Sequence, residues 1–227
     1  AMMWGLIPPW HRSDSPKGHG LTTNNARIEN IRQSKLYRPV VESKRRCVVI
    51  CDGFYEWKTF SDKTKQPYLI YAKQADKIIK QPESPLNESG NNSSTIKIQT
   101  HEKLSNNWNQ EDGWIGQRPL FMAAIYSKWN PSGSTSSNCP NPLDPIYSYT
   151  VITRESGKTM GWLHDRMPLF LQDGDDVRMW LDPNVSGFDA IEAINGNQNE
   201  AELSWHPVSP SVGNIRKQGE DLMLKVE

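Results

Sequence analysis

The fold of this chain is decided by one stretch, Arg46-Cys47-Val48-Val49-Ile50-Cys51-Asp52-Gly53-Phe54-Tyr55-Glu56-Trp57-Lys58. β-Branched and aromatic residues fill it on both sides of Gly53, which predicts strands over Arg46–Asp52 and Phe54–Lys58. Only Gly53 separates the two runs, and glycine tolerates the backbone angles that a bulge imposes. We therefore interpret the stretch as two adjacent strands or as one strand with a bulge.

Three more strands and two helices are predicted around this stretch. Short β-branched and aromatic runs predict strands over Pro67–Ala72, Leu120–Tyr126 and Tyr147–Thr153. Apolar residues at helical spacing predict helices over Asp175–Leu181 and Gly187–Ile194. Because strands outnumber helices and do not alternate regularly with them, the pattern favours an α+β fold with antiparallel pairing over a parallel nucleotide-binding sheet.

Length, charge and composition narrow the class of protein. The 227 residues fit one domain better than two, and 26 basic residues balance 26 acidic ones, so any phosphate binding must come from a local cluster. No apolar run approaches the ~20 residues of a membrane-spanning helix. Residues 73–113 are rich in Asn, Ser, Gln, Lys and Glu, which predicts a disordered insertion loop, and Asn130–Pro145 predicts a second surface loop.

Two polar segments are candidates for binding or activating a substrate. Asn25 and Arg27 project to the same side if their segment is extended, and an arginine fork beside an amide suits a phosphate or carboxylate. The alternative is the start of a helix with an ordinary solvated arginine. Glu56 has aromatic neighbours that partly desolvate it, which makes it a candidate acid or base. The alternative for Glu56 is the water-facing side of a half-buried strand.

A third segment contains the best single catalytic candidate. His164 begins the polar triplet His164-Asp165-Arg166, which apolar residues enclose, and histidine titrates near neutral pH. The alternative is a structural, hydrogen-bonded histidine. Because no two histidines have metal-ligand spacing, we assign no metal and expect no cofactor.

Aromatic and basic residues suggest a surface for nucleic acid. Trp4 and Trp10 flank a Gly- and Pro-containing segment, where they either stack on a nucleobase or pack in the core. The cluster Lys44-Arg45-Arg46 is either a solvated face or the rim of a phosphate-binding groove. Charge alone does not separate these alternatives.

Seven segments, taken in order, resemble the SOS-response-associated peptidase (SRAP) family of abasic-site processing proteins. They are Trp4-Gly5-Leu6-Ile7-Pro8-Pro9-Trp10, Asn25-Ala26-Arg27-Ile28-Glu29, Arg46-Cys47, Asp52-Gly53-Phe54-Tyr55-Glu56-Trp57, Thr150-Val151-Ile152-Thr153, His164-Asp165-Arg166-Met167-Pro168 and Trp205-His206-Pro207-Val208-Ser209. The resemblance spans almost the whole chain. It implies a single SRAP-type domain over residues 1–227, with an antiparallel barrel-like sheet, a few short helices and a positively charged groove for single-stranded DNA.

The resemblance also implies an activity and its residues. Family members act in the DNA damage response by forming a covalent adduct with abasic sites in single-stranded DNA, through a cysteine at the mature N-terminus. The implied catalytic residues are Glu56, His164 and Asn25, and the implied DNA-binding residues are Arg27, Arg166, Trp4 and Arg46. Glu56 would handle protons on the N-terminal amine, His164 would serve ring opening and proton transfer, and Asn25 would hold the N-terminal residue.

The chain departs from the family at its first residues. Family members begin Met-Cys-Gly-Arg, several tens of residues before the Trp-Gly-Leu segment, whereas this sequence begins Ala1-Met2-Met3 immediately before it. We therefore expect a domain that lacks its N-terminal segment and its nucleophile. The cysteines, Cys47, Cys51 and Cys139, cannot replace that nucleophile, because an internal cysteine has no free amine beside its thiol.

Two other functions and several properties complete the expectations. One alternative is a non-catalytic module that binds single-stranded or junction DNA. A lower-ranked alternative is a peptidase limited to removing its own initiator methionine. Because three cysteines cannot all pair, we expect an intracellular protein, located in the nucleus of a eukaryote or the cytoplasm of a bacterium. We further expect a monomer that binds abasic single-stranded DNA and no membrane.

Overall fold

The computed structural model describes residues 1–13, 15–74, 108–109, 113–114, 118–131, 144–197 and 202–226. The chain forms two compact units, each assembled from separate parts of the sequence. The first unit comprises Ala1–Ile50 and Phe121–Ala201, and the second comprises Cys51–Leu120 and Glu202–Glu227. Most of the two predicted loops, 73–113 and 130–145, lies outside the described residues. Within the first loop, β6 (Trp108–Asn109) and β7 (Gly113–Trp114) pair in antiparallel fashion.

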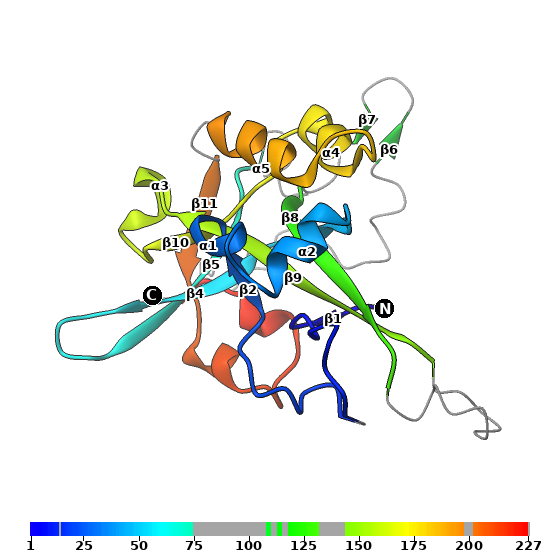
Figure 1. Cartoon of the computed structure of the whole chain (residues 1–227). Coiled ribbons are helices and arrows are strands. Elements are labelled where there is room, and N and C mark those ends of the chain that lie inside the picture. Colours follow the sequence, from blue (N-terminus) through cyan, green and yellow to red (C-terminus); the bar gives the residue numbers. More distant parts are fainter. Residues whose placement is uncertain are drawn as a thin grey trace, which may run out of the picture. The chain divides into compact units, whose positions relative to one another are not determined.

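A six-stranded sheet organises the first unit (Figure 1). Its strands are β1 (Met3–Trp4), β2 (Asn25–Arg27), β3 (Arg46–Cys51), β8 (Leu120–Trp129), β9 (Ile146–Glu155) and β10 (Arg166–Pro168). Strand β9 is central, because it pairs with β8 and β10 in antiparallel fashion and with β1 and β2 in parallel fashion. The predicted strands over Leu120–Tyr126 and Tyr147–Thr153 are confirmed, and each extends further than expected.

Four helices share a hydrophobic core with this sheet. They are α1 (Ile28–Ile31), α2 (Tyr37–Glu42), α4 (Gly174–Leu181) and α5 (Gly187–Gly196), and a fifth helix, α3 (Lys158–Gly161), precedes β10. The core joins Val41 of α2, Trp180 of α4 and Ile191 of α5 to Ile125 and Ile152 of the sheet, all of them buried. The helices predicted over Asp175–Leu181 and Gly187–Ile194 are confirmed as α4 and α5.

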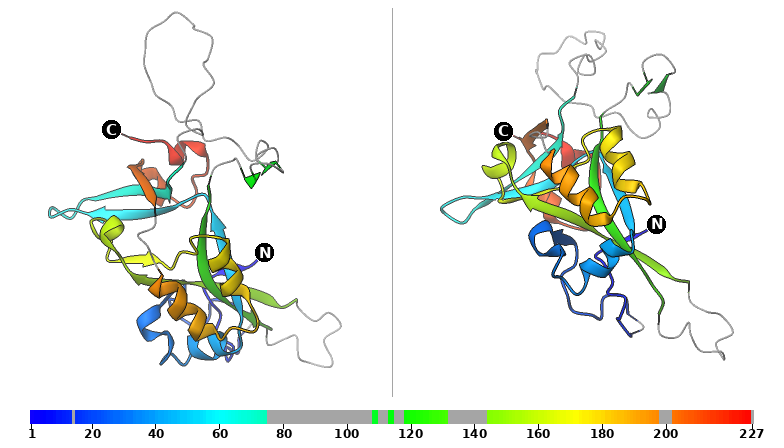
Figure 2. Two further views of the ribbon diagram at one scale, coloured as in Figure 1. Left: turned by 90° about the horizontal axis from the view of Figure 1, so that it is seen from above. Right: turned by 45° about the horizontal axis from the view of Figure 1, so that its top comes forward.

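The second unit contains a three-stranded antiparallel sheet. Figure 2 shows β4 (Phe54–Thr59) and β5 (Lys65–Ala72) as a long hairpin, and β11 (Leu203–Pro207) pairs with β5. Two 3-10 helices follow, η3 (Pro210–Gly213) and η4 (Glu220–Met223). The hydroxyl of Tyr55 donates to the Leu222 carbonyl at 3.4 Å, and His206 Nε2 lies 2.8 Å from the Met223 carbonyl oxygen, so η4 is tied to the sheet.

The Asp52-Gly53 segment separates two sheets, which decides between the two readings of residues 46–58. Strand β3 belongs to the six-stranded sheet and β4 to the three-stranded one, so the stretch is two strands and not one bulged strand. A Cβ atom at Gly53 would lie 2.6 Å from the Ile70 carbonyl oxygen. Glycine is therefore required here because β5 approaches closely, and not because of a bulge.

The α+β class that the sequence predicts is confirmed; antiparallel pairing predominates, and the parallel partners β1 and β2 add to one sheet. Within the part of the chain that the structure describes, no helix has the length and apolar character needed to cross a membrane.

Candidate functional site

Strand β2 presents two of the predicted site residues on one face. Asn25 and Arg27 are exposed while Ala26 between them is fully buried, so the expectation that the two side chains project to the same side is confirmed. Arg27 lies opposite Thr153 of β9 in the ladder. The alternative of a helix start is also partly right, because α1 begins immediately after Arg27 without a side-chain cap.

Strand β10, which begins at Arg166 two residues after His164, pairs with the same central strand β9 as β2 does. Pro168 of β10 pairs with Thr153, the residue that Arg27 faces from β2. The backbone N–H of Arg166 donates to Nδ1 of His164 at 2.9 Å. Because a backbone N–H always donates, Nδ1 holds a lone pair, and the neutral imidazole therefore carries its proton on Nε2.

Nδ1 of His164 has a second neighbour that implies a different protonation state. Asp165 Oδ1 lies 3.1 Å from Nδ1, a contact that stabilises only a ring protonated at Nδ1. One ring nitrogen cannot accept from Arg166 and donate to Asp165 at the same time. We assign the neutral ring to the Arg166 contact, because the Asp165 side chain is 85% exposed and its attraction is weakened by water.

The guanidinium of Arg166 is bound inside the protein. Nη1 and Nη2 donate to Glu29 Oε1 and Oε2 at 2.8 and 2.9 Å, and Nη2 also donates to the Thr153 carbonyl at 2.9 Å. The hydrogen bonds from Arg166 lower the pKa of Glu29, so the carboxylate stays ionised at neutral pH. The Arg166 side chain is only 14% exposed. Three hydrogen bonds within the protein thus hold the terminal nitrogens of Arg166, and its DNA contact stays a prediction.

Glu56 belongs to the second unit, where it lies on β4 opposite Tyr68 of β5. Its Oε1 atom accepts a hydrogen bond from the Trp57 backbone N–H at 3.2 Å. All residues from Phe54 to Lys58 are half-buried, so β4 lacks the alternation that a simple water-facing side would produce. The burial pattern thus disfavours the alternative interpretation of Glu56.

The two remaining predicted DNA contacts have opposite environments. The Trp4 ring is 55% exposed, and its Nε1 donates to the Asn24 carbonyl at 2.9 Å, which fixes the ring beside β2. Arg46 is buried instead, and its Nη2 donates to the carbonyl oxygens of Asp182 and Val185 at 2.5 and 2.9 Å. The burial of Arg46 argues against the predicted DNA contact, and we assign it to the junction between α4 and α5.

The structure describes two of the three cysteines, Cys47 and Cys51, and both are free and half-buried. Burial raises the pKa of Cys47 and Cys51 to about 11, so each thiol is protonated at neutral pH. Among the described residues, no group of three or more His, Cys, Asp and Glu side chains is arranged to hold a metal ion.

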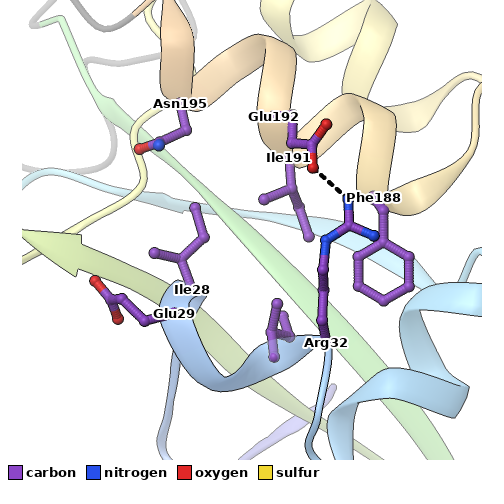
Figure 3. Close-up of a pocket in the computed structure, with 8 residues that line it drawn as sticks. Ile28, Glu29, Arg32, Phe188, Ile191, Glu192 and Asn195 are labelled. Carbon is purple, nitrogen blue, oxygen red and sulfur yellow. Dashed lines mark hydrogen bonds and ion pairs between the residues drawn. The ribbon is translucent and has the colours of Figure 1, made fainter.

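A small cavity lies between α1 and α5 (Figure 3). Its volume is about 160 Å³, and its lining includes Ile28, Arg32, Ile191 and Asn195. Ligand pockets usually measure roughly 300–1,000 Å³, so this cavity is too small for a nucleotide. We therefore place the candidate site on the exposed polar face of β2 and at the start of β10, not in this cavity.

The sequence does not point to Glu29 as a site residue. It stands two positions after Arg27, but its partner Arg166 is 137 residues away, and neither hydrophobic periodicity nor motif spacing reports such a pairing. Tyr37 is a similar case, since its half-buried hydroxyl donates to the Asn25 carbonyl at 3.4 Å.

The geometry defines an α+β protein whose candidate polar site lies along the C-terminal half of the central strand β9. The family model described as SOS response associated peptidase (SRAP) matches residues 1–215, and the chain therefore belongs to this family. Abasic site processing protein HMCES of Xenopus tropicalis is 37% identical over the whole chain, which covers 57% of that protein. Abasic site processing protein YoqW of Bacillus subtilis is 26% identical over 98% of the chain and 74% of its own length.

A solved structure agrees with the fold. A protein from Bacteroides thetaiotaomicron superposes with a TM-score of 0.66 at 18% identity, covering 99% of this chain and 75% of the other. Among the curated relatives, the chain spans little more than half the length of HMCES.

Proposed function

We propose that this protein processes abasic sites in single-stranded DNA by forming a covalent DNA–protein crosslink. The observation that carries the proposal is the exposed pair Asn25 and Arg27 on β2, beside the strand that also holds the His164 segment. The relatives also support the proposal, because HMCES and YoqW are both named abasic site processing proteins. The same proposal includes a monomeric protein that acts inside the cell, in the nucleus of a eukaryote or the cytoplasm of a bacterium.

The proposed chemistry requires an N-terminal cysteine. Its α-amine condenses with the abasic aldehyde to a Schiff base and releases water, and its thiol then adds to the imine carbon to close a thiazolidine ring. The 227 residues contain no such cysteine at their start, and the half-buried Cys47 and Cys51 have neither a free amine nor an ionised thiol. The reaction is therefore tested on a chain extended to begin Met-Cys-Gly.

The proposed roles follow from what each side chain offers. Arg27 contributes an exposed cation for a phosphate, and Asn25 beside it contributes an amide for the DNA backbone or the N-terminal residue. His164, with its proton on Nε2, donates to the sugar oxygen as the ring opens. Glu56 is an acceptor for protons of the N-terminal amine.

Exposed aromatic residues extend the proposed DNA surface. Trp4 and Trp10 are each about half exposed, and a solvent-facing aromatic ring stacks on an unpaired base without regard to sequence. Removing one such stack typically costs roughly 1–3 kcal/mol of binding. Trp4 is the better placed of the two, because its ring is anchored beside Asn25.

A time course with abasic single-stranded DNA tests the proposal. The extended protein should form a band that survives denaturing electrophoresis, whereas the same protein with serine in place of the N-terminal cysteine should not form a thiazolidine. His164→Ala and Glu56→Ala should slow adduct formation or release by roughly 10²–10⁴-fold while binding to intact single-stranded DNA is retained. If both variants react at the parental rate, the assignment of these residues is wrong.

The same assay separates the alternative functions. A protein that binds DNA with Arg27 and Trp4 but never forms a stable adduct is a non-catalytic binding module. Cleavage of an unrelated peptide substrate would favour a general peptidase, which the proposed chemistry does not require beyond removal of the initiator methionine.

A further inference from the structure

One face of the three-stranded sheet is tied to η4, and Glu56 lies on the opposite face. Residues directly opposite each other on neighbouring strands share a face, and successive residues of a strand alternate between the two faces. Tyr55 and His206 are both paired with Leu69, so they share a face, and both side chains contact backbone carbonyl oxygens of η4. Glu56 follows Tyr55 on β4 and therefore belongs to the other face.

Lys58 and Phe60 continue the face of Glu56 toward the tip of the β4–β5 hairpin. The Phe60 backbone N–H donates to the Thr64 carbonyl at 2.9 Å, which carries the ladder one step beyond β4. Nζ of Lys58 lies 5.6 Å from the centroid of the Phe60 ring, so the two side chains are on one side, and the ring is 42% exposed. At about 3.4 Å per residue, Phe60 lies roughly 13 Å along the strand from Glu56.

A second partly exposed aromatic ring lies on the same face. Trp205 of β11 is paired with Ile70 of β5, and Ile70 is paired with Phe54, which stands two residues before Glu56. The Trp205 side chain is 40% exposed. A sheet face that combines exposed rings with a lysine is typical of proteins that bind single strands, because every unpaired base offers a face for stacking.

The hairpin turn holds a lysine where glycine fits best. The Lys63 N–H donates to the Phe60 carbonyl at 3.0 Å, and the Phe60 N–H donates to the Thr64 carbonyl, which closes a three-residue loop. The backbone of Lys63 has a φ of 67°, the left-handed conformation that such a loop requires and that glycine adopts without steric cost. The chain thus keeps a positive charge at the tip although its backbone conformation disfavours a side chain there.

The tip is also locally basic in a chain that has no net charge. Residues 58–66 contain three lysines, Lys58, Lys63 and Lys65, and one acidic residue, Asp62. The Asp62 carboxylate accepts from the Thr64 backbone N–H at 2.9 Å and from its hydroxyl at 2.6 Å, so it braces the turn. In Figures 1 and 2 the tip extends away from β11, η3 and η4 of the same unit. A local cluster of this kind is what phosphate binding by a neutral protein requires.

We propose that the Glu56 face of the β4–β5 hairpin, defined by Glu56, Lys58 and Phe60, binds the single-stranded DNA that flanks the abasic site. Phe60 stacks on an unpaired base, and Lys58 and Lys63 bind phosphates. A single strand fits better than a duplex, because the bases of a duplex are already stacked on one another. The inference deepens the proposed function and rests on it, since it takes Glu56 to act on the abasic nucleotide and places Phe60 at the nucleotides beside it.

Anisotropy titrations of the full chain with a labelled, intact oligothymidylate test the stacking contact. Phe60→Ala should weaken binding by roughly 5- to 100-fold, the factor that the loss of one base stack produces. Phe60→Leu keeps an apolar side chain without the ring and should also weaken binding, which covers the case in which Phe60→Ala disturbs the hairpin. The same titrations with a duplex show whether the contact is specific for an unpaired strand.

Three lysine variants, each without one positive charge, test the phosphate contacts. Lys58→Gln and Lys63→Gly should each reduce the salt slope of binding by roughly 0.7. Lys63→Gly should at the same time melt no lower than the parent, because glycine adopts a positive φ freely, so weaker binding cannot be ascribed to a damaged fold. Lys65→Gln is the matched control, because Lys65 is paired with Thr59 and lies on the other face; its affinity and slope should stay parental.

The outcomes separate this inference from the proposed function. Parental binding by Phe60→Ala and Lys63→Gly would overturn the inference, and so would a parent chain that does not bind the oligothymidylate. An equal loss of slope in all three lysine variants would overturn the assignment to the Glu56 face, and a loss confined to duplex DNA would overturn the single strand as the ligand. Weakened binding by the variants, together with an extended chain that never reacts with abasic DNA, would support the hairpin contact and refute the proposed crosslinking.

Discussion

Replacing Gly187 with alanine tests how closely α5 packs on α2. Gly187 is the buried first residue of α5, and a Cβ atom there would lie 2.6 Å from the Val41 carbonyl oxygen and 2.7 Å from Val41 Cγ1. Val41 is fully buried, so it has no open space to move into. Restoring an ordinary contact requires the two helices to separate by about 0.8 Å. Overpacking of this kind costs about 1–3 kcal/mol.

We therefore expect Gly187→Ala to lower the thermal unfolding midpoint by roughly 2–12 °C, because a chain of this size loses about 2–4 °C per kcal/mol. Gly196→Ala, at the other end of the same helix, is the matched control. A Cβ atom at Gly196 meets nothing within 4 Å, so this variant should melt at or slightly above the parent. Near-UV circular dichroism during heating measures both. If Gly187→Ala melts no lower than Gly196→Ala, the α2–α5 contact is not as close as described.

Four further outcomes are expected. Asp173 caps α4 by accepting from the backbone N–H groups of Asp175 and Asp176, so Asp173→Ala should lower the free energy of unfolding by about 1 kcal/mol in urea titrations, and Asp173→Asn should restore most of it. Arg46→Ala should lower the melting midpoint by several degrees and leave the salt slope of DNA binding unchanged, because Arg46 is buried and its Nη2 donates to the Asp182 and Val185 carbonyls. A reduced slope would return Arg46 to the DNA surface. Arg27→Ala should reduce that slope by roughly 0.7 in binding isotherms at several salt concentrations, and an unchanged slope would contradict a phosphate contact. The folded-state pKa of Glu29 lies below 4.5, so the stabilisation that its ion pair provides is present above that pH and is lost on acidification. The stability advantage of the parent over Glu29→Gln should therefore shrink below about pH 4.5. A constant difference between the two proteins in acid melts would refute the ion pair.

The long strands and the two longest helices were predictable from the sequence, and the short elements were not. Strand β9 is rich in β-branched and aromatic residues, β8 is apolar over most of its length, and α4 and α5 have apolar residues at helical spacing. In contrast, β1 and β10 have only two and three residues, and each exists because β9 lies beside it. Helix α2 contains Pro39, which usually signals a helix end but is tolerated in the first turn.

The candidate site was predictable as a set of residue types but not as a set of contacts. Asn25, Arg27 and His164 stood out in the sequence because their side chains can bind a phosphate or transfer a proton, and their roles stay predictions. Arg46 and Arg166 looked equally suitable in the sequence. The structure shows that both arginines are bound inside the protein. The sequence does not reveal this, because their acceptors are residues more than 130 positions away.

The distribution of ion pairs explains how a chain with no net charge can keep positive potential at one place. Among the described residues, Arg32 pairs with Glu192, Arg38 with Glu42, and Arg166 with Glu29, so each of these cations is offset by a carboxylate within bonding distance. Arg27 takes part in no salt bridge with the residues that the structure describes, although it lies close enough to Glu29 to lower the pKa of that carboxyl. Because Glu29 is held by Arg166, its charge is already compensated. Arg27 therefore keeps most of its positive potential on the exposed face of β2, where it could bind a phosphate.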